Sequence, residues 1–125
     1  MVNALIEKLK TGSIKSVVLF GDQTTSLKTP YVVVKPESGA GDGQRQWRII
    51  VHEKVGMYDS LSKYLFQELD ELLVNKNGAK VFITDEAGMY RLYASGYTDI
   101  QTDTSDSTIF MERLFIQPFR NGGSI

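Results

Sequence analysis

His52 is the first residue to test for chemistry, because it is the only histidine among the 125 residues. A catalytic or metal-binding imidazole needs partner groups that converge on it. The only charged residue next to it in the sequence is Glu53. Neighbouring residues of a strand point to opposite faces of a sheet, so these two side chains diverge. The sequence therefore predicts a half-exposed strand histidine with no catalytic or ligating role.

Acidic residues gather in the polar segment 95–107, at Asp99, Asp103 and Asp106. An EF-hand calcium loop would need its glycine and its terminal glutamate, and this segment lacks that pattern. We therefore expect a solvated acidic loop. A further acidic pair, Asp85 and Glu86, falls in a predicted turn, where turn formation explains carboxylates better than acid–base catalysis does.

No nucleophile stands out from the sequence. The chain has no cysteine, which excludes disulfides, thiolate metal sites and a cysteine nucleophile. Its serine, threonine and lysine residues have no histidine partner and no nucleophile-elbow motif. We therefore expect a protein that is not an enzyme and that has no catalytic residue, no cofactor and no metal.

Two further patterns could suggest a nucleotide- or phosphate-binding site, but neither is predicted to be one. Gly39, Gly41 and Gly43 resemble a phosphate-binding loop, but the GK[ST] ending is missing and a strand follows, not a helix. This loop is predicted to be a flexible connector. Trp47 and the tyrosines could stack on nucleotide bases, yet their spacing favours a core and the arginines are dispersed.

Composition and net charge limit the classes of protein to which the chain can belong. Hydrophobic residues make up 42% of the chain, which is enough for one genuine core, and the length fits one domain spanning residues 1–125. A formal net charge of −1 argues against non-specific nucleic-acid binding. The first ten residues lack an uninterrupted apolar run, and no segment approaches a membrane span, so we expect synthesis in the cytoplasm and no membrane partner.

The element that must organise the fold lies between residues 45 and 75. Alternation over 45–52 predicts a strand with Trp47, Ile49 and Val51 on one face. Gly56 ends it, and Asp59 is placed to cap the next helix. That helix carries the richest apolar row in the chain, which comprises Leu61, Leu65, Leu69, Leu72 and Leu73.

The other elements are shorter. Asn3 is a possible cap for a helix over residues 3–11 that Gly12 ends. Strands are predicted at 16–20, 31–35 and 108–119, a hairpin at 80–84 and 89–94, and a left-handed helix stop at Asn77 or Gly78. The expected fold class is α+β: a single mixed, mainly antiparallel sheet packed on one long helix of about residues 59–75, with a short N-terminal helix.

The sheet is predicted to be apolar on both faces but interrupted by charges at Arg48, Arg91, Glu112 and Arg113. One face is expected to pack against the long helix. The other is too apolar to be fully solvated and too charged to be a buried core, and we expect it to meet another subunit.

Two passages carry a resemblance to a known family. One is the proline-led strand over residues 29–34, and the other runs from Arg48 through Gly56 into the helix that reaches Leu73; the late strand over residues 112–118 also fits. In these passages and in element order the chain resembles the tail terminator (tail completion) proteins of long-tailed bacteriophages.

The resemblance implies a structural virion protein of the tail neck region. It implies a homohexameric ring that caps the tail tube protein, stops its polymerisation and meets the head–tail connector or stopper protein, with DNA only passing through the lumen. The alternatives left open are another neck (head completion) protein, a monomeric module that binds a protein or an apolar ligand, and a small enzyme that would use His52, Asp99 and Asp103.

The candidate contact residues are chosen only because they are polar or charged and expected at the surface, since no family motif identifies them. Four arginines are predicted to form ion pairs between subunits, and polar residues of the loops 22–28 and 36–44 to touch tube or connector. These residues are Arg45, Arg48, Arg91, Arg113, Asp22, Gln23, Lys28, Glu37 and Asp42.

Overall fold

A computed structural model describes residues 1–23, 27–37, 45–86 and 88–117, and it has the predicted α+β architecture. The helical elements are α1 (Val2–Leu9) and a long helix made of α2 (Tyr58–Lys63), the π-helical segment η1 (Tyr64–Glu68) and α3 (Leu69–Leu73). Among the described residues, no helix has the length and apolar character needed to cross a membrane.

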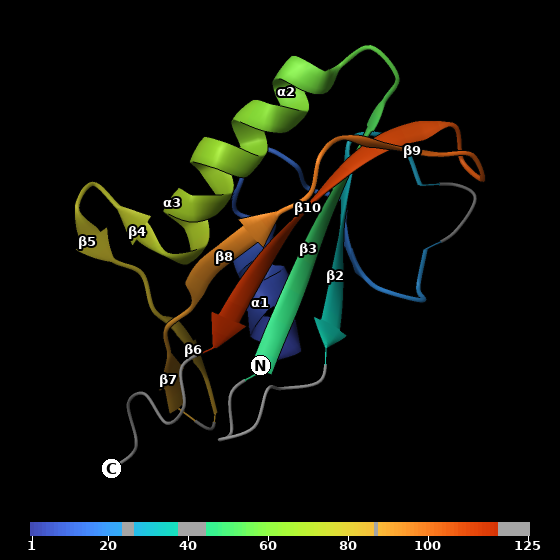
Figure 1. The fold of residues 1–125 in the computed structure, drawn as a ribbon. Coiled ribbons are helices and arrows are strands. Elements are labelled where there is room, and N and C mark those ends of the chain that lie inside the picture. The colour runs from blue at the N-terminus through green and yellow to red at the C-terminus, as the bar shows by residue number, and fades with distance from the viewer. Residues whose placement is uncertain (24–26, 38–44, 87, 118–125) are drawn as a thin grey trace.

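The strands form one large sheet and two small hairpins (Figure 1). Their bounds are β1 (Val17–Leu19), β2 (Tyr31–Glu37), β3 (Arg45–Lys54), β4 (Asn75–Lys76), β5 (Ala79–Lys80), β6 (Ile83–Asp85), β7 (Gly88–Tyr90), β8 (Tyr93–Tyr97), β9 (Gln101–Asp103) and β10 (Thr108–Gln117). The large sheet has the order β1-β2-β3-β10-β8, and β9 pairs with β10 beyond the end of β8. Only β1 and β2 run parallel, so the sheet is mixed and mainly antiparallel, as predicted.

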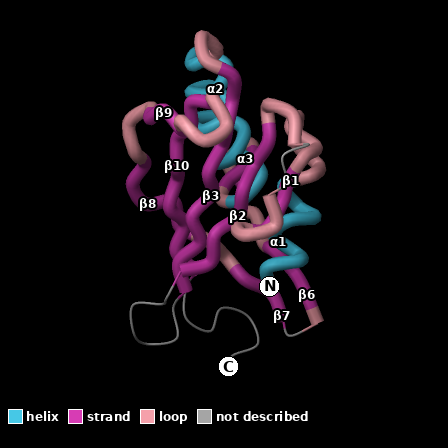
Figure 2. The backbone as a smooth tube through the Cα atoms, turned by 90° about the vertical axis from the view of Figure 1, so that its right-hand side faces the viewer, coloured by secondary structure: helices cyan, strands magenta, loops and turns pink. Residues whose placement is uncertain are grey.

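Figure 2 shows the long helix against one face of this sheet. The leucine row of this helix belongs to the hydrophobic core that it forms with the sheet. Leu61, Leu65, Leu69 and Leu73 are almost fully buried, whereas Leu72 lies at the margin. Residues four apart drift by about 40° per step around a regular α-helix. The wider turn of the π-helical segment η1 reduces this drift and keeps the row on one side.

The ends of the helices differ from the predictions because side-chain caps are not used. The long helix begins at Tyr58 after Met57, so Asp59 lies in its first turn and is not the cap. Helix α1 likewise begins at Val2, before Asn3, and buries Leu5 and Leu9 in the same core. Burial against the sheet supplies the stability that capping was expected to add.

Gly12 has a role different from the predicted helix stop. Its φ lies outside the left-handed region, and a Cβ there would come within 2.7 Å of Glu68 Oε1 and of Leu72 Cδ1. The chain after α1 therefore passes close to the long helix, and a larger residue at this position would require the Glu68 and Leu72 side chains to shift. The positive φ predicted at Asn77 or Gly78 is present at both (φ 54° and 84°), but the predicted role is wrong: the long helix already ends at Leu73 with Val74 as its cap, and Asn77 and Gly78 form the turn between β4 and β5.

The polar segment 95–107 contains strand structure that the sequence pattern did not predict: all of β9 and the part of β8 that follows the strand predicted at 89–94. The segment 95–107 was expected to be a loop, yet β8 extends to Tyr97 and β9 follows it, both paired with β10. A register shift in this pairing coincides with the positive φ of Gly96. Because of the shift, Tyr93 lies opposite Ile116 and Tyr97 opposite Arg113, so the two tyrosines are on different faces of the sheet.

The second face of the sheet is more closed than predicted. Val33 is fully buried there, and Tyr31 and Ile50 are nearly so, in a small cluster that Val18, Leu27 and Phe110 complete. Asp106, in the segment after β9, also contacts this cluster by accepting a hydrogen bond from the Tyr31 hydroxyl. The expectation of a broad uncovered apolar face is therefore wrong for the middle of the sheet, because the chain covers that part itself.

Leu65→Ala tests the dependence of the fold on the leucine row. We expect a loss of about 2–5 kcal/mol in the free energy of unfolding, because the truncation leaves a cavity in the centre of the core. Urea denaturation followed by circular dichroism measures it. The matched control is Leu72→Ala, at the margin of the row, which should cost clearly less; equal losses would contradict a buried row that ends at the margin.

Candidate functional site

Three rings stack across neighbouring strands on the second face of the sheet. Tyr31 of β2 and Phe110 of β10 both lie opposite His52 of β3 in the strand register. The Tyr31 and His52 ring centroids are 4.6 Å apart at an interplanar angle of 10°, and those of His52 and Phe110 are 5.3 Å apart at 28°. His52 is therefore held as the middle ring of a stack and is 6% exposed.

A chain of hydrogen bonds joins this stack to the segment that connects β9 and β10. The Thr108 hydroxyl donates to Asp106 Oδ1 at 2.6 Å and lies 3.0 Å from His52 Nδ1. Since that hydroxyl proton is used on Asp106, Nδ1–H is the donor to Thr108 Oγ1, which leaves the lone pair on Nε2. The Tyr31 hydroxyl donates to Asp106 Oδ2.

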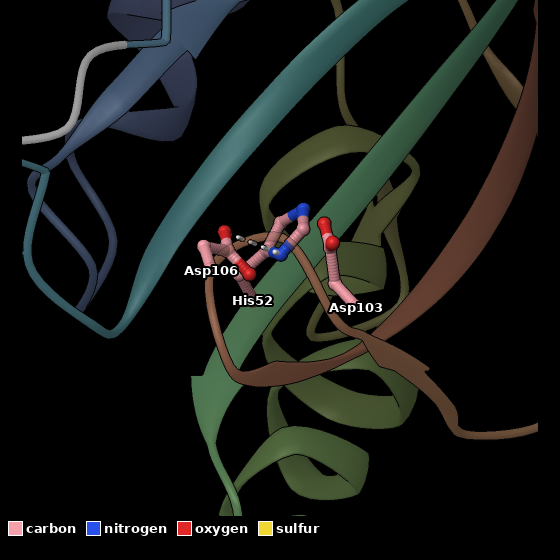
Figure 3. A group of neighbouring side chains, drawn as sticks. All are labelled: His52, Asp103 and Asp106. Atoms are coloured by element: carbon pink, nitrogen blue, oxygen red, sulfur yellow. Dashed lines mark ion pairs between the residues drawn. The ribbon is translucent and has the colours of Figure 1, made fainter.

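Asp103, at the end of β9, completes a group of three possible metal ligands. One ligand atom from each of His52, Asp103 and Asp106 lies within 4.8 Å of the others. Figure 3 shows the imidazole lying between the two carboxylates, and its Nδ1 is 3.9 Å from Asp106 Oδ2. Asp103 itself accepts hydrogen bonds only locally among the described residues, from the backbone N–H and the hydroxyl of Ser105.

Burial and charge fix the protonation states of this group. Burial, followed by the bond to Asp106, raises the pKa of Tyr31 well above its ordinary range, so the phenol stays protonated. Burial lowers the pKa of His52, against the attraction of Asp106 and Asp103. Burial acts to raise the pKa of Asp106, but its bonds from Thr108 and Tyr31 outweigh this and hold that pKa below its ordinary value. At neutral pH the site therefore combines a neutral imidazole with an ionised Asp106.

A surface hollow of about 490 Å³ opens beside the group. His52, Asp103 and Asp106 all line it, and so do Lys35 and Glu112. Such a site offers one imidazole nitrogen and several carboxylate oxygens to a small ligand or ion. Neither an activated nucleophile nor an oxyanion hole is evident among the residues that line it.

The position of His52 corrects the sequence prediction. It is buried and not half-exposed, and its partners are Asp103 and Asp106, more than fifty residues away in the chain. Asp99, which the sequence grouped with them, is exposed and lies outside the group. The missed signal is the pairing of β3 with β10, which places Thr108 and Phe110 beside His52 and cannot be read from local alternation.

The predicted contact residues have varied surroundings. Arg48 pairs within the chain with Glu37 (2.7 Å) and Glu112 (3.0 Å), and Arg113 with Asp70 (3.0 Å). Arg91 lies over the Tyr93 ring at 5.3 Å. Arg45, Asp22, Gln23 and Lys28 are exposed, and Asp42 lies outside the described residues. Their role between subunits stays a prediction, and the two pairings show that Arg48 and Arg113 already have partners.

A second cavity, of about 790 Å³, lies between the chain after α1 and the long helix. Ser13 closes its rim by donating its backbone N–H and its hydroxyl to the Glu68 carboxylate. Glu53 and Tyr64 line it and are both buried. Among the described residues the Tyr64 hydroxyl has no hydrogen-bond partner.

Comparison with known proteins adds no relative: no protein-family model matches the sequence, and neither does any curated protein.

Tyr31→Phe tests the bond between the ring stack and Asp106. Removing a hydroxyl that donates to an ionised carboxylate should cost about 1.5–3 kcal/mol of unfolding free energy. Urea denaturation at neutral pH measures it. Tyr97→Phe is the control, since Tyr97 is exposed, and it should stay within about 0.5 kcal/mol of the parent. A Tyr31→Phe protein as stable as the control would argue against the bond.

Glu37→Gln tests the ion pair on the second face by its pH dependence. The bond from Arg48 lowers the pKa of Glu37 below its ordinary value of 4.5. The stability from this pair is therefore present above pH 4.5 and lost as the pH falls through the lowered pKa. We expect the parent to exceed Glu37→Gln by about 1 kcal/mol or less at pH 7, with the difference shrinking in acid. A difference independent of pH would contradict the pairing; thermal unfolding across pH 3–7 measures it.

Proposed function

We propose that the protein is a structural, ring-forming subunit that terminates a bacteriophage tail tube and joins it to the head-side connector. The resemblance of the sequence to tail terminators is the origin of this proposal. The fold is compatible with it: an α+β subunit with helices on one face of a sheet is the architecture that the resemblance implies. The function requires self-association and needs no catalytic residue.

The observation that carries the proposal is an exposed aromatic pair at an open edge of the sheet. Tyr97 of β8 and Phe66 of the long helix meet edge-to-face, with ring centroids 4.9 Å apart, and are 55% and 44% exposed. Arg113 lies over the Tyr97 ring at 5.7 Å and pairs with Asp70 beneath. Aromatic side chains beside an arginine are the composition favoured at the centres of protein interfaces.

The two edges of the sheet supply the geometry of a ring. Among the described strands, β1 at one edge and β8 at the other each have a neighbour on one side only. The edges differ in sequence, so a contact that joins β8 of one subunit to the β1 side of the next is heterologous. Repeated heterologous contacts close into a ring when the rotation between subunits divides a full turn.

Several weak contacts to a tube end become one strong contact when the subunits are joined in a ring, because each further contact forms at high effective concentration. The segments 22–28 and 36–44 are the proposed tube and connector contacts; residues 24–26 and 38–44 lie outside the described residues. DNA passes through the lumen without being read, in keeping with a net charge of −1.

A second candidate function is a monomeric binding module, and the 790 Å³ cavity favours it. The Tyr64 hydroxyl beside that cavity is buried without a hydrogen-bond partner among the described residues. A polar ligand or ordered water could satisfy it. Such a module would be stabilised against heat by its ligand while remaining a monomer.

Tyr97→Ser tests the proposed function. The full-length protein should sediment as a concentration-dependent oligomer and appear in negative stain as rings with a central opening. The substitution should shift the sedimentation to monomer without lowering the melting temperature, because Tyr97 is exposed. Tyr58→Ser is the matched control: Tyr58 is 56% exposed and lies at the start of the long helix, away from the pair, so rings should persist. A strict monomer at all concentrations, or equal loss of rings in both variants, would overturn the proposal.

A further inference from the structure

We propose that the hollow beside His52 is a binding site for a divalent transition-metal ion, with His52, Asp103 and Asp106 as its protein ligands. This inference is independent of ring formation. One imidazole nitrogen with carboxylate oxygens is a ligand set that suits zinc and its neighbours better than magnesium or calcium, which prefer oxygen alone.

The spacing of the three groups is close to what such an ion requires. Zinc bonds of about 2.0–2.2 Å place pairs of ligand atoms roughly 3–4 Å apart. One ligand atom from each of His52, Asp103 and Asp106 lies within 4.8 Å of the other two. A movement of about 1 Å brings the set to bonding distance. Asp103 can supply it by side-chain rotation, because its hydrogen bonds among the described residues are only to Ser105 nearby.

The fixed member of the set is His52, and its hydrogen bonds are those of a ligand. The ring is held between Tyr31 and Phe110, and Nδ1–H donates to Thr108, which in turn donates to Asp106. Metal-bound histidines commonly donate their other ring N–H in this way, which fixes the tautomer and the ring orientation. Nε2, the remaining nitrogen, has no hydrogen-bond partner within the described part of the chain.

The imidazole is evidence for a ligand that does not depend on the acidic residues. It is buried, it has a free lone pair, and it lines the hollow. His52 is 6% exposed, so it is withdrawn from bulk water, and it is one of the residues that line the hollow. Asp106 uses one lone pair of each oxygen on Thr108 and Tyr31 and keeps the others. Three protein ligands leave a coordination position open toward the hollow for water.

The single histidine makes a direct test possible. In the full-length protein at neutral pH, stoichiometric ZnCl₂ should shift or broaden the His52 ring signals in a proton–nitrogen NMR spectrum, where no other imidazole contributes. Magnesium chloride at the same concentration should leave them unchanged. Unaltered His52 signals at saturating zinc would overturn the proposal.

Asp103→Asn measures the contribution of the mobile ligand. Asparagine keeps the acceptor for Ser105, so the fold should be retained, while calorimetric zinc affinity should fall at least about tenfold. Asp99→Asn is the matched control, since Asp99 is exposed and outside the group, and its zinc affinity should equal the parent's. Equal weakening in both variants would mean diffuse attraction to surface carboxylates and would also overturn the proposal.

Discussion

Burial of the leucine row against the core face of the sheet is the constraint on which the rest of the structure depends. Leu61, Leu65, Leu69 and Leu73 occupy a single line because η1 turns more slowly than an α-helix. That line fixes the position of the long helix over β3 and β10, and α1 then packs beside it. The chain after α1 then passes close to the long helix at Gly12, where a Cβ would come within 2.7 Å of the ends of the Glu68 and Leu72 side chains.

The opposite face of the sheet is held together by different forces. No helix covers it in the described part of the chain, and its cover is assembled from polar side chains and stacked rings. Arg48 bridges two carboxylates, and Asp106 accepts bonds from Tyr31 and Thr108. Such networks contribute less stability per contact than apolar burial, but each member restricts the geometry of the others. This face is therefore ordered enough to hold a site and open enough to admit a small ligand.

The edges of the sheet are the surfaces best suited to bind another molecule. A strand edge exposes unpaired backbone groups, and Phe66 and Tyr97 add apolar area beside one of them. The Gly96 register shift is part of this arrangement, because it turns Tyr97 toward the helix while Tyr93 stays on the other face. The proposed ring contact and the proposed metal site thus use separate parts of the sheet, and either function can be lost without the other.

The sequence by itself determined the elements whose signals are local. Alternation placed Trp47, Ile49 and Val51 on the core face, and leucine spacing predicted the long helix, because a strand repeats every two residues and a helix about every 3.6. β9 and the last three residues of β8 were missed because polar residues alternate weakly. Pairing with β10, and not their own sequence pattern, makes them strands. The site at His52 was missed for a related reason. Only the tertiary structure decided it, because the register of β3 against β10 joins residues more than fifty positions apart, and no local periodicity records which strands become neighbours.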